Sequence, residues 1–394
     1  MHRISDDERR ARLAVRHHLA TSARLTDVVK VAGDLVGLHA TDPATIFLGA
    51  AARLKTPGRA VAALERGLYE DHTIVRTLGM RRTMFVVPVA LVPVIQAGCT
   101  DALVPAQRKR AVRMIEESGV ARDGARWLKR VEAATVAALD ELGEATASEL
   151  SKVVPDLARK LVIDPDKKWG GEVGVSTRVL FLLSTEQRVV RGRPLGRWTS
   201  SQHRWAPMDT WFPDGIPSMP AVEARAELVR RWLRTYGPAT TTDVKWWTGW
   251  PLGHTKAAIA AVGAVEVDLE SGGTGWVLPD DGASVRSPKP WVALLPSLDS
   301  ATMGWKERDW YLGEHAPTLF DRNGNAGPTV WADGRIVGGW VQRASGEVVY
   351  ELLEDVGRDT TTAIEKAAAT LEGWLGEVRV KPRFPTPLQK ELEA

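Results

Sequence analysis

The chain has 394 residues, of which 44% are hydrophobic and 26% charged, and its net charge is +3. This length predicts two to four domains, and the composition is typical of a globular protein. The polar N-terminus excludes a secretory signal, and no stretch reaches about 18 uninterrupted apolar residues, so we expect no membrane segment and a cytoplasmic location. The single cysteine, Cys99, and the scattered histidines predict neither a disulfide nor a metal centre, and we expect no cofactor.

Arginine dominates the basic residues, with 37 arginines against 15 lysines. A guanidinium is a planar fork of donors that suits phosphate contact. A GC-rich genome would produce the same bias, so composition leaves both explanations open.

The N-terminal part follows the element order of a winged helix. Apolar residues recur at helical spacing over residues 6–19 and 25–38, and Asp42-Pro43 predicts a turn. Further helices are predicted at 45–54 and 58–67. Residues 73–88 then switch to a hairpin pattern. We assign residues 1–105 to a first winged helix with an additional N-terminal helix.

One eight-residue pattern occurs twice, each time after an amphipathic helix. The sequences are GEATASEL from Gly143 and GPATTTDV from Gly237. Glycine suits the C-cap of the first helix, the hydroxyl caps the next helix, and the acid lies at that helix's positive end. We interpret the pattern as two helix-turn-helix motifs, which predict winged helices at 106–215 and 216–288.

Both later modules have a predicted wing. In the second module the wing begins in residues 175–190 and continues through a basic turn, and in the third it joins 264–269 to 275–278. The second wing and a preceding helix are rich in basic residues that could contact phosphate or form an ordinary charged surface. These residues are Arg108, Lys109, Arg110, Arg188, Arg191, Arg193 and Arg197.

The C-terminal part changes to β structure. Strands are predicted at 291–295, 329–332, 335–342 and 347–353, with Asp333-Gly334 as a hairpin turn. A helix at 360–375 and a short strand at 377–381 follow. Residues 289–394 are therefore predicted to form a small β-barrel or curled sheet with one helix, and the fold class is α+β.

His39 and Thr41 stand two residues apart at the end of the helix predicted over 25–38. Taken alone, they suit an ordinary helix end, with the histidine near the negative end of the dipole and the threonine satisfying backbone groups.

The chain resembles the winged-helix DNA glycosylases typified by the azinomycin-resistance glycosylase and its crosslink-unhooking relatives. The resemblance implies three tandem winged helices in a C shape followed by a β-barrel, with double-stranded DNA as the partner. It covers nearly the whole chain and rests on residues 35–43, 76–83, 294–299, 305–309, 324–329, 334–335 and 338–340.

The sequence departs from this family where the catalytic motif lies. Two family glutamines, separated by one apolar residue and thought to position the water that attacks C1′, match His39 and Thr41. The resemblance therefore implies that His39, with an unperturbed pKa of about 6.5, holds or activates that water with help from Thr41. A second departure places Arg82 and Phe85 where family members usually have glycine and histidine.

We therefore expect a monofunctional DNA glycosylase that hydrolyses the N-glycosidic bond of bulky N7-alkylpurine adducts, with crosslink unhooking as an open extension. Arg81 and Arg82 would contact DNA near the lesion. Asp299, Lys306 and Arg308 would shape the cleft or only hold a domain contact. The alternative is a non-catalytic winged-helix DNA-binding protein, either a regulator or a lesion-binding factor. Neither a membrane nor an obligate protein partner is expected.

Overall fold

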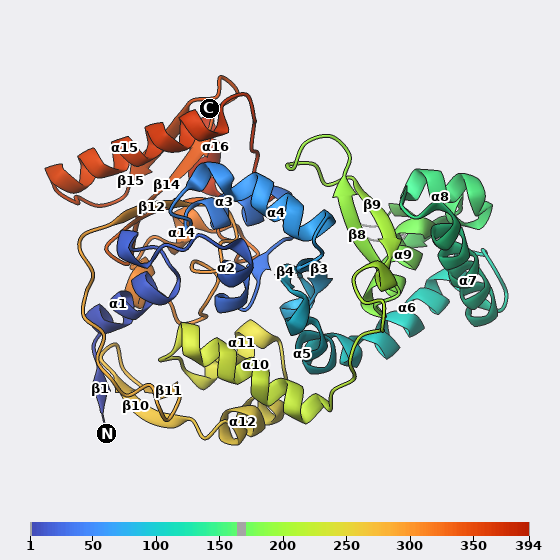
Figure 1. Cartoon of the computed structure of the whole chain (residues 1–394), viewed down its shortest axis with the longest axis horizontal. Coiled ribbons are helices and arrows are strands. Elements are labelled where there is room, and N and C mark those ends of the chain that lie inside the picture. Colours follow the sequence, from blue (N-terminus) through green and yellow to red (C-terminus); the bar gives the residue numbers. More distant parts are fainter. Residues whose placement is uncertain (1, 164–170, 394) are drawn as a thin grey trace.

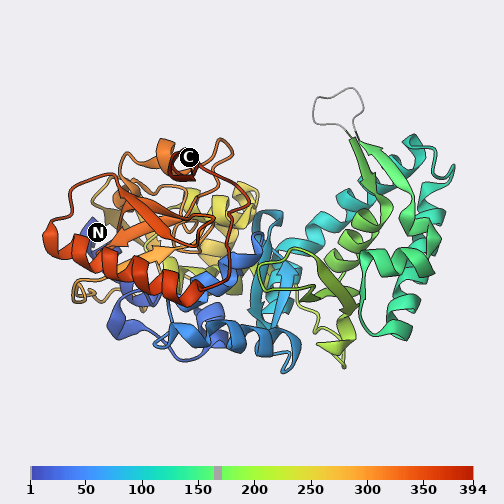
Figure 2. The same ribbon diagram turned by 90° about the horizontal axis from the view of Figure 1, so that it is seen from above.

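The computed structural model describes residues 2–163 and 171–393. It is a mixed α+β structure of three units, in which one order of elements repeats, and a C-terminal sheet. In Figure 1 the first unit lies near the centre, the second on the right, the third below the first, and the C-terminal sheet at the upper left. The second unit is again set apart when the molecule is seen from above (Figure 2).

The first unit builds a three-stranded sheet against three helices. Its sheet order is β2-β4-β3, so the first short strand pairs with the last strand of the hairpin. The hairpin predicted at 73–88 is confirmed. The elements are α2 (Val28–Asp34), β2 (Leu38–His39), α3 (Pro43–Ala51), α4 (Ala60–Tyr69), β3 (Ile74–Leu78) and β4 (Met84–Pro88).

The helix predicted over 25–38 is too long at both ends. Asp27 caps α2 by accepting from the Val29 N–H, and the helix ends at Asp34. Val36 and Gly37 then take positive φ values of 56° and 118°, which turn the chain into β2. There His39 pairs with Phe85, so the helix-end explanation of His39 is wrong.

The second unit repeats this order, with sheet order β5-β9-β8. The helix predicted around residues 107–113 is confirmed, as is Thr146 as a cap, because Thr146 and Glu149 form a capping box. A two-stranded ribbon of β6 (Lys160–Ile163) and β7 (Gly171–Gly174) is inserted between α8 and α9. The other elements are α6 (Val104–Glu117), α7 (Gly124–Leu142), β5 (Ala145–Thr146), α8 (Ala147–Val153), α9 (Val175–Thr185), β8 (Val189–Pro194) and β9 (His203–Pro207).

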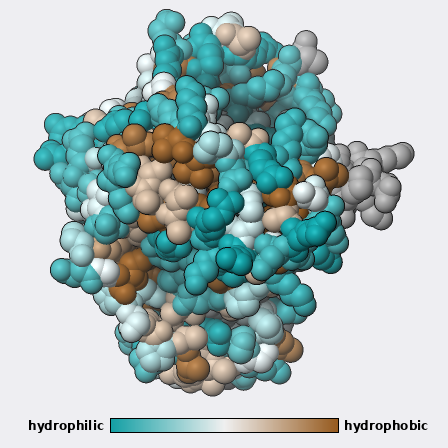
Figure 3. Space-filling model, turned by 90° about the vertical axis from the view of Figure 1, so that its right-hand side faces the viewer, coloured by the Kyte–Doolittle hydropathy of each residue, from teal (hydrophilic) through white to brown (hydrophobic). Residues whose placement is uncertain are grey.

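The second wing lies later in the chain than predicted. Residues 175–185 form α9. The prediction failed here because a short apolar run suits a buried helix as well as a strand. The hairpin is β8–β9, so Arg191 and Arg193 lie on a strand and Arg197 in the connection. Figure 3 views the molecule from the right-hand side of Figure 1, where the second unit lies, and this face is mostly hydrophilic with small apolar patches.

The third unit has the same order, with Ala239 bridging to Trp276 in place of the first short strand. Thr240 forms the predicted cap, here a capping box with Asp243, whereas Gly237 has extended rather than left-handed backbone. The hairpin predicted to join 264–269 to 275–278 is confirmed as β10–β11. The elements are α10 (Ala221–Tyr236), α11 (Thr241–Thr248), α12 (Leu252–Ala261), β10 (Val265–Leu269) and β11 (Thr274–Val277).

The N-terminal residues pack on this third unit, although the sequence places them beside the first. The strand β1 (Arg3–Ile4) pairs with β10 in parallel. The helix α1 (Asp6–Arg16) is held by Arg16, whose guanidinium donates to both carboxylate oxygens of Asp281 at 2.6 and 2.9 Å.

The C-terminal part is an open antiparallel sheet in the order β12-β13-β14-β15. Asp333 and Gly334, with φ values of 48° and 85°, form the predicted tight turn. In the described residues the edge strands do not pair, and 377–381 form no strand, so no closed barrel is found and the barrel alternative of the prediction is not confirmed. The helix α15 packs against both edge strands instead. The elements are β12 (Val292–Leu295), β13 (Thr329–Ala332), β14 (Arg335–Gln342), β15 (Val348–Leu352) and α15 (Arg358–Leu375), with the short helices α13 (Asp309–Leu312), α14 (Ala316–Leu319) and α16 (Pro387–Glu393).

One helical run, residues 89–117, is long and apolar enough by length and composition to cross a membrane. Nearly half of its most apolar window is buried in the fold. Its first part, which includes α5 (Val92–Ile95), packs against α10. A core helix of a globular protein satisfies the same criterion.

Candidate active site and nucleic-acid interface

His39 is a buried, neutral histidine with a free ring nitrogen. Its side chain is 4% exposed, and its ring lies edge-on to Phe85 with 5.1 Å between centroids. Nδ1 is buried and finds no hydrogen-bond partner among the described residues. Burial, followed by the charge of Arg81, lowers the pKa of His39 to about 3. The imidazole is therefore neutral at physiological pH.

Thr41 has the same unusual feature. Its Oγ1 is buried and also lacks a hydrogen-bond partner within the part of the chain that the structure describes. Buried polar atoms are nearly always paired, because an unpaired one costs about 1–3 kcal/mol. Two such atoms on alternating residues of one short segment are suited to a molecule that binds there.

Thr41 lines a cleft of about 500 Å³ between the first and second units, which we call the basic cleft. No aspartate or glutamate lines it in the described residues. The lining residues are Ala40, Thr41, Pro43, Arg76, Thr146, Ala147, Ser148, Arg191, Leu195, Ser201, Gln202, His203, Trp205 and Arg383.

Two arginines of the basic cleft are held by the β3 and β8 strands. The Arg76 Nη1 lies 3.2 Å from His203 Nε2, while His203 Nδ1 faces the Gly192 carbonyl at 3.3 Å. Burial, then Arg76, then Arg191, lower the pKa of His203 to about 3, so neutral His203 accepts from Arg76. Burial, then Arg76 and Arg383, lower the pKa of Arg191 to about 10. The basic cleft is therefore lined by Arg76, Arg191 and Arg383, and by no carboxylate in the described residues.

Asp42 brings the third arginine to the cleft from the far end of the chain. One carboxylate oxygen caps α3 by accepting from the Ala44 N–H at 3.0 Å, and the other accepts from the Arg383 N–H at 2.9 Å. Asp42 is buried, so this connection fixes the C-terminal segment beside Thr41. The predicted Asp-Pro turn is therefore also a helix N-cap.

Arg81 and Arg82 lie in a strained turn close to His39. Both have positive φ, 52° and 59°, which non-glycine residues rarely adopt. The Arg81 guanidinium lies 4.0 Å from the ring centroid of Trp246, and its Nε is buried without a partner in the described residues. Burial, then the charge of Arg308, lower the pKa of Arg81 to about 10. Arg82 is exposed.

Comparison with known proteins identifies the family. The sequence model described as DNA glycosylase AlkZ-like matches residues 32–374, which is most of the chain. The chain belongs to the AlkZ-like DNA glycosylase family. Its activity class is therefore that of a DNA glycosylase in DNA repair, with DNA as its substrate.

A solved structure supports the same fold. The fold is similar to that of the DNA glycosylase AlkZ of Streptomyces sahachiroi, with a TM-score of 0.72 and 22% sequence identity. The match covers 97% of this chain and 99% of the other. No curated protein matches the chain significantly.

The other basic residues predicted to contact DNA fall into two groups in this AlkZ-like chain. Arg82, Lys109, Arg110 and Arg188 are exposed. Arg108 is paired with Glu132 and Glu186, Arg193 with Glu65 and Glu70, and Arg197 donates to the Glu377 carbonyl. Among the residues predicted from sequence to contact DNA, Arg191 alone lines the basic cleft with Thr41 in the described part of the chain.

The residues expected to shape the cleft have different surroundings. Asp299 is buried in a two-bond ion pair with Arg53, at 2.7 and 2.8 Å. Lys306 has an exposed side chain, and its backbone N–H donates to Asp243 at 2.8 Å. The Arg308 guanidinium lies 4.9 Å from the Trp246 ring and 4.8 Å from Phe320, so it shares Trp246 with Arg81.

Sequence reasoning missed Arg53, Arg76, His203, Trp246 and Arg383. Arg76 lies in one of the stretches that carried the family resemblance, so a signal for it existed. Nothing in the sequence marks Arg383, which lies beside Thr41 in the cleft because its backbone N–H donates to Asp42. Within residues 2–163 and 171–393, no group of three or more His, Cys, Asp or Glu side chains is arranged to hold a metal ion.

Proposed function

We propose that this glycosylase hydrolyses the N-glycosidic bond of bulky N7-alkylated purines, and that His39 and Thr41 hold the attacking water. The observation that carries the proposal is that two buried atoms, His39 Nδ1 and Thr41 Oγ1, have no hydrogen-bond partner in the described part of the chain. They occupy the positions that match the two glutamines of the family motif. Both side chains are neutral, as glutamine is, and each can accept or donate a hydrogen bond.

The reaction needs little acid catalysis. Alkylation at N7 makes the purine cationic, so the bond from C1′ to N9 breaks with its electron pair leaving on the base. The sugar develops oxocarbenium character, water adds to C1′ and loses a proton to solvent, and an abasic sugar remains. Because the pKa of His39 is about 3, the imidazole is neutral near neutral pH, and in this proposal it orients the attacking water.

Water is the nucleophile in this proposal, which makes the enzyme monofunctional. A bifunctional glycosylase would need an amine at the reacting carbon, and no lysine lines the basic cleft in the described residues. The three repeated units would act as winged helices on double-stranded DNA, with the basic cleft holding backbone phosphate near the lesion. Crosslink unhooking would be the same hydrolysis at a purine joined to both strands.

The test is release of abasic sites from a duplex that contains one N7-alkylguanine, detected by alkaline strand cleavage. We expect cleavage at the modified base and none in the same duplex without it. Crosslinked duplex, assayed for separation of the strands, tests the extension. If the protein binds these duplexes in a salt-dependent manner but yields no abasic sites, the non-catalytic alternative is correct.

The basic cleft makes a separate prediction about DNA affinity. We expect Arg191→Gln and Arg383→Gln each to make the slope of log K against log salt concentration shallower by about 1, because each removes one phosphate contact. Arg383→Gln keeps the backbone N–H that binds Asp42. Arg234→Gln is the control, because Arg234 is exposed on α10 and paired with Asp280. Unchanged slopes in both cleft variants would place the DNA elsewhere.

A further inference from the structure

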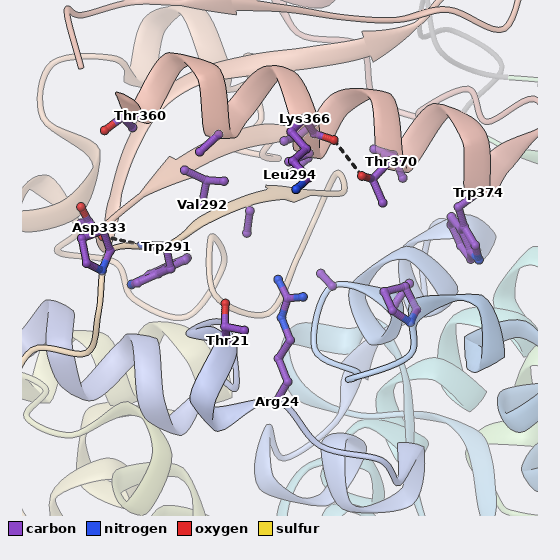
Figure 4. Close-up of a pocket in the computed structure, with 18 of the residues that line it drawn as sticks. Thr21, Arg24, Trp291, Val292, Leu294, Asp333, Thr360, Lys366, Thr370 and Trp374 are labelled. Carbon is purple, nitrogen blue, oxygen red and sulfur yellow. Dashed lines mark hydrogen bonds between the residues drawn. The ribbon is translucent and has the colours of Figure 1, made fainter. Parts of the chain in front are cut away.

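A second cavity lies apart from His39 and Thr41, between the C-terminal sheet and the first unit. Figure 4 shows it under α15, with the edge strand β12 along one side and the segments of Thr21 and Arg24 opposite. Its volume is about 570 Å³, within the usual range for small-molecule sites. We call it the α15 groove. None of the residues assigned above to DNA or to the reaction lines it.

The walls of the α15 groove are mainly aliphatic, with a tryptophan towards each end. Trp291 is buried, and Trp374 is partly buried with its ring 6.0 Å from that of Trp198. The aliphatic lining comes from α3, β12 and α15 and consists of Leu48, Ala51, Ala52, Val292, Ala293, Leu294, Ala363, Ala367 and Leu371. These walls suit an apolar body.

Two cations interrupt this apolar lining at mid-length. Figure 4 shows Arg24 and Lys366 extending towards each other from opposite sides. Neither side chain has a hydrogen bond or ion pair with another described residue, and Arg24 Nε is buried. Burial lowers the pKa of Arg24, the direction expected for a cation without a counter-ion.

The acids of the groove lie towards one end and do not neutralise this pair. The Asp333 carboxylate accepts from the Trp291 N–H at 2.8 Å, and Asp359 lies next to Thr360 at the start of α15. In Figure 4 Asp333 and Thr360 are at the end away from Trp374. The two positive charges in the middle of the groove therefore have no negative partner among the described residues.

We propose that the α15 groove binds a small amphipathic carboxylate, with its apolar chain along the aliphatic walls and its carboxylate between Arg24 and Lys366. The carboxylate would receive charge-assisted hydrogen bonds from both cations, and the chain would remove apolar wall surface from water. This inference goes beyond the glycosylase reaction. Because the ligand would contact both the C-terminal sheet and the first unit, its binding would also stabilise the fold.

The direct test is calorimetric titration of the full chain with decanoate, below its micelle concentration and without DNA. We expect a one-to-one complex and a melting temperature that rises with decanoate concentration. Decanol has the same chain without the charge, and decyltrimethylammonium has the opposite charge. We expect both to bind at least about tenfold more weakly, and equal binding of decanoate and decanol would overturn the proposal.

Variants locate the site. Arg24→Met and Lys366→Met keep an apolar stem but remove the charge, and each should weaken decanoate binding about tenfold. Ala367→Trp should abolish binding by filling the groove while leaving both cations. Arg59→Met is the control, because Arg59 is exposed and does not line the groove. Decanoate binding that survives all three groove variants would contradict the proposal, whatever the glycosylase assay shows.

Discussion

Replacing Asp299 with alanine is expected to lower the free energy of unfolding by about 3–5 kcal/mol, because it leaves the Arg53 charge buried and unpaired. The two side chains are 0% and 2% exposed and are joined by two hydrogen bonds. Arg53 also donates to the carbonyls of His17 and Gly49, so it cannot turn out to solvent without losing further bonds. Urea unfolding, followed by far-UV circular dichroism, measures the loss.

An exposed ion pair and a double variant serve as controls for this prediction. Glu347→Ala removes a partner of Arg343 from a pair that is about half exposed, and we expect less than about 1 kcal/mol. Arg53→Met combined with Asp299→Leu should lose less stability than Asp299→Ala, since no buried charge is left unpaired, although the bonds to the carbonyls of His17 and Gly49 are lost. If this double variant folds but no longer releases abasic sites, the Arg53–Asp299 pair shapes the cleft as well as the fold. An Asp299→Ala loss no larger than that of Glu347→Ala would contradict the prediction.

Replacing His39 with alanine is expected to slow base excision by about 100-fold, the usual cost of removing one preorganised hydrogen-bonding group. His39→Gln should stay within about tenfold of the wild type, because glutamine offers the same neutral donor and acceptor and restores one residue of the family motif. Single-turnover rates on N7-alkylguanine duplex measure both. His254→Ala is the control, since His254 is exposed on α12. Undiminished excision by His39→Ala would refute the assigned role.

The pH dependence tests whether His39 is neutral in the folded enzyme. Since the pKa of His39 is about 3, the excision rates of the wild type and of His39→Gln should depend on pH in the same way near pH 6.5. The free energy of unfolding should depend on pH instead. Below about pH 6.5 the unfolded chain gains a proton at this residue that the folded chain does not, so its contribution to stability falls as the pH falls towards 3. Over this pH range the free energy of unfolding of His39→Gln should change less than that of the wild type.

Local sequence signals predicted much of the fold. The hairpin at 74–88, the Asp333-Gly334 turn and the caps Thr146 and Thr240 each depend on side chains and backbone angles within a few residues. The repeated eight-residue pattern correctly marked two equivalent helix pairs. The residues around His39 and Thr41 could be singled out only because the family resemblance aligned them with a catalytic motif.

Contacts between distant residues decided the rest. His39 lies on a strand because Leu38 and His39 pair with Val86 and Phe85, and no local pattern encodes that pairing. The predicted barrel depended on whether two edge strands meet, and α15 packs against those strands instead. Sequence by itself determined the family, the repeated units and the position of the motif. Only the tertiary structure decided that His39 Nδ1 and Thr41 Oγ1 are buried without a partner in the described residues and that Thr41 lines a basic cleft, because the charges around them come from Arg81, Arg191 and Arg383, which lie far apart in the chain.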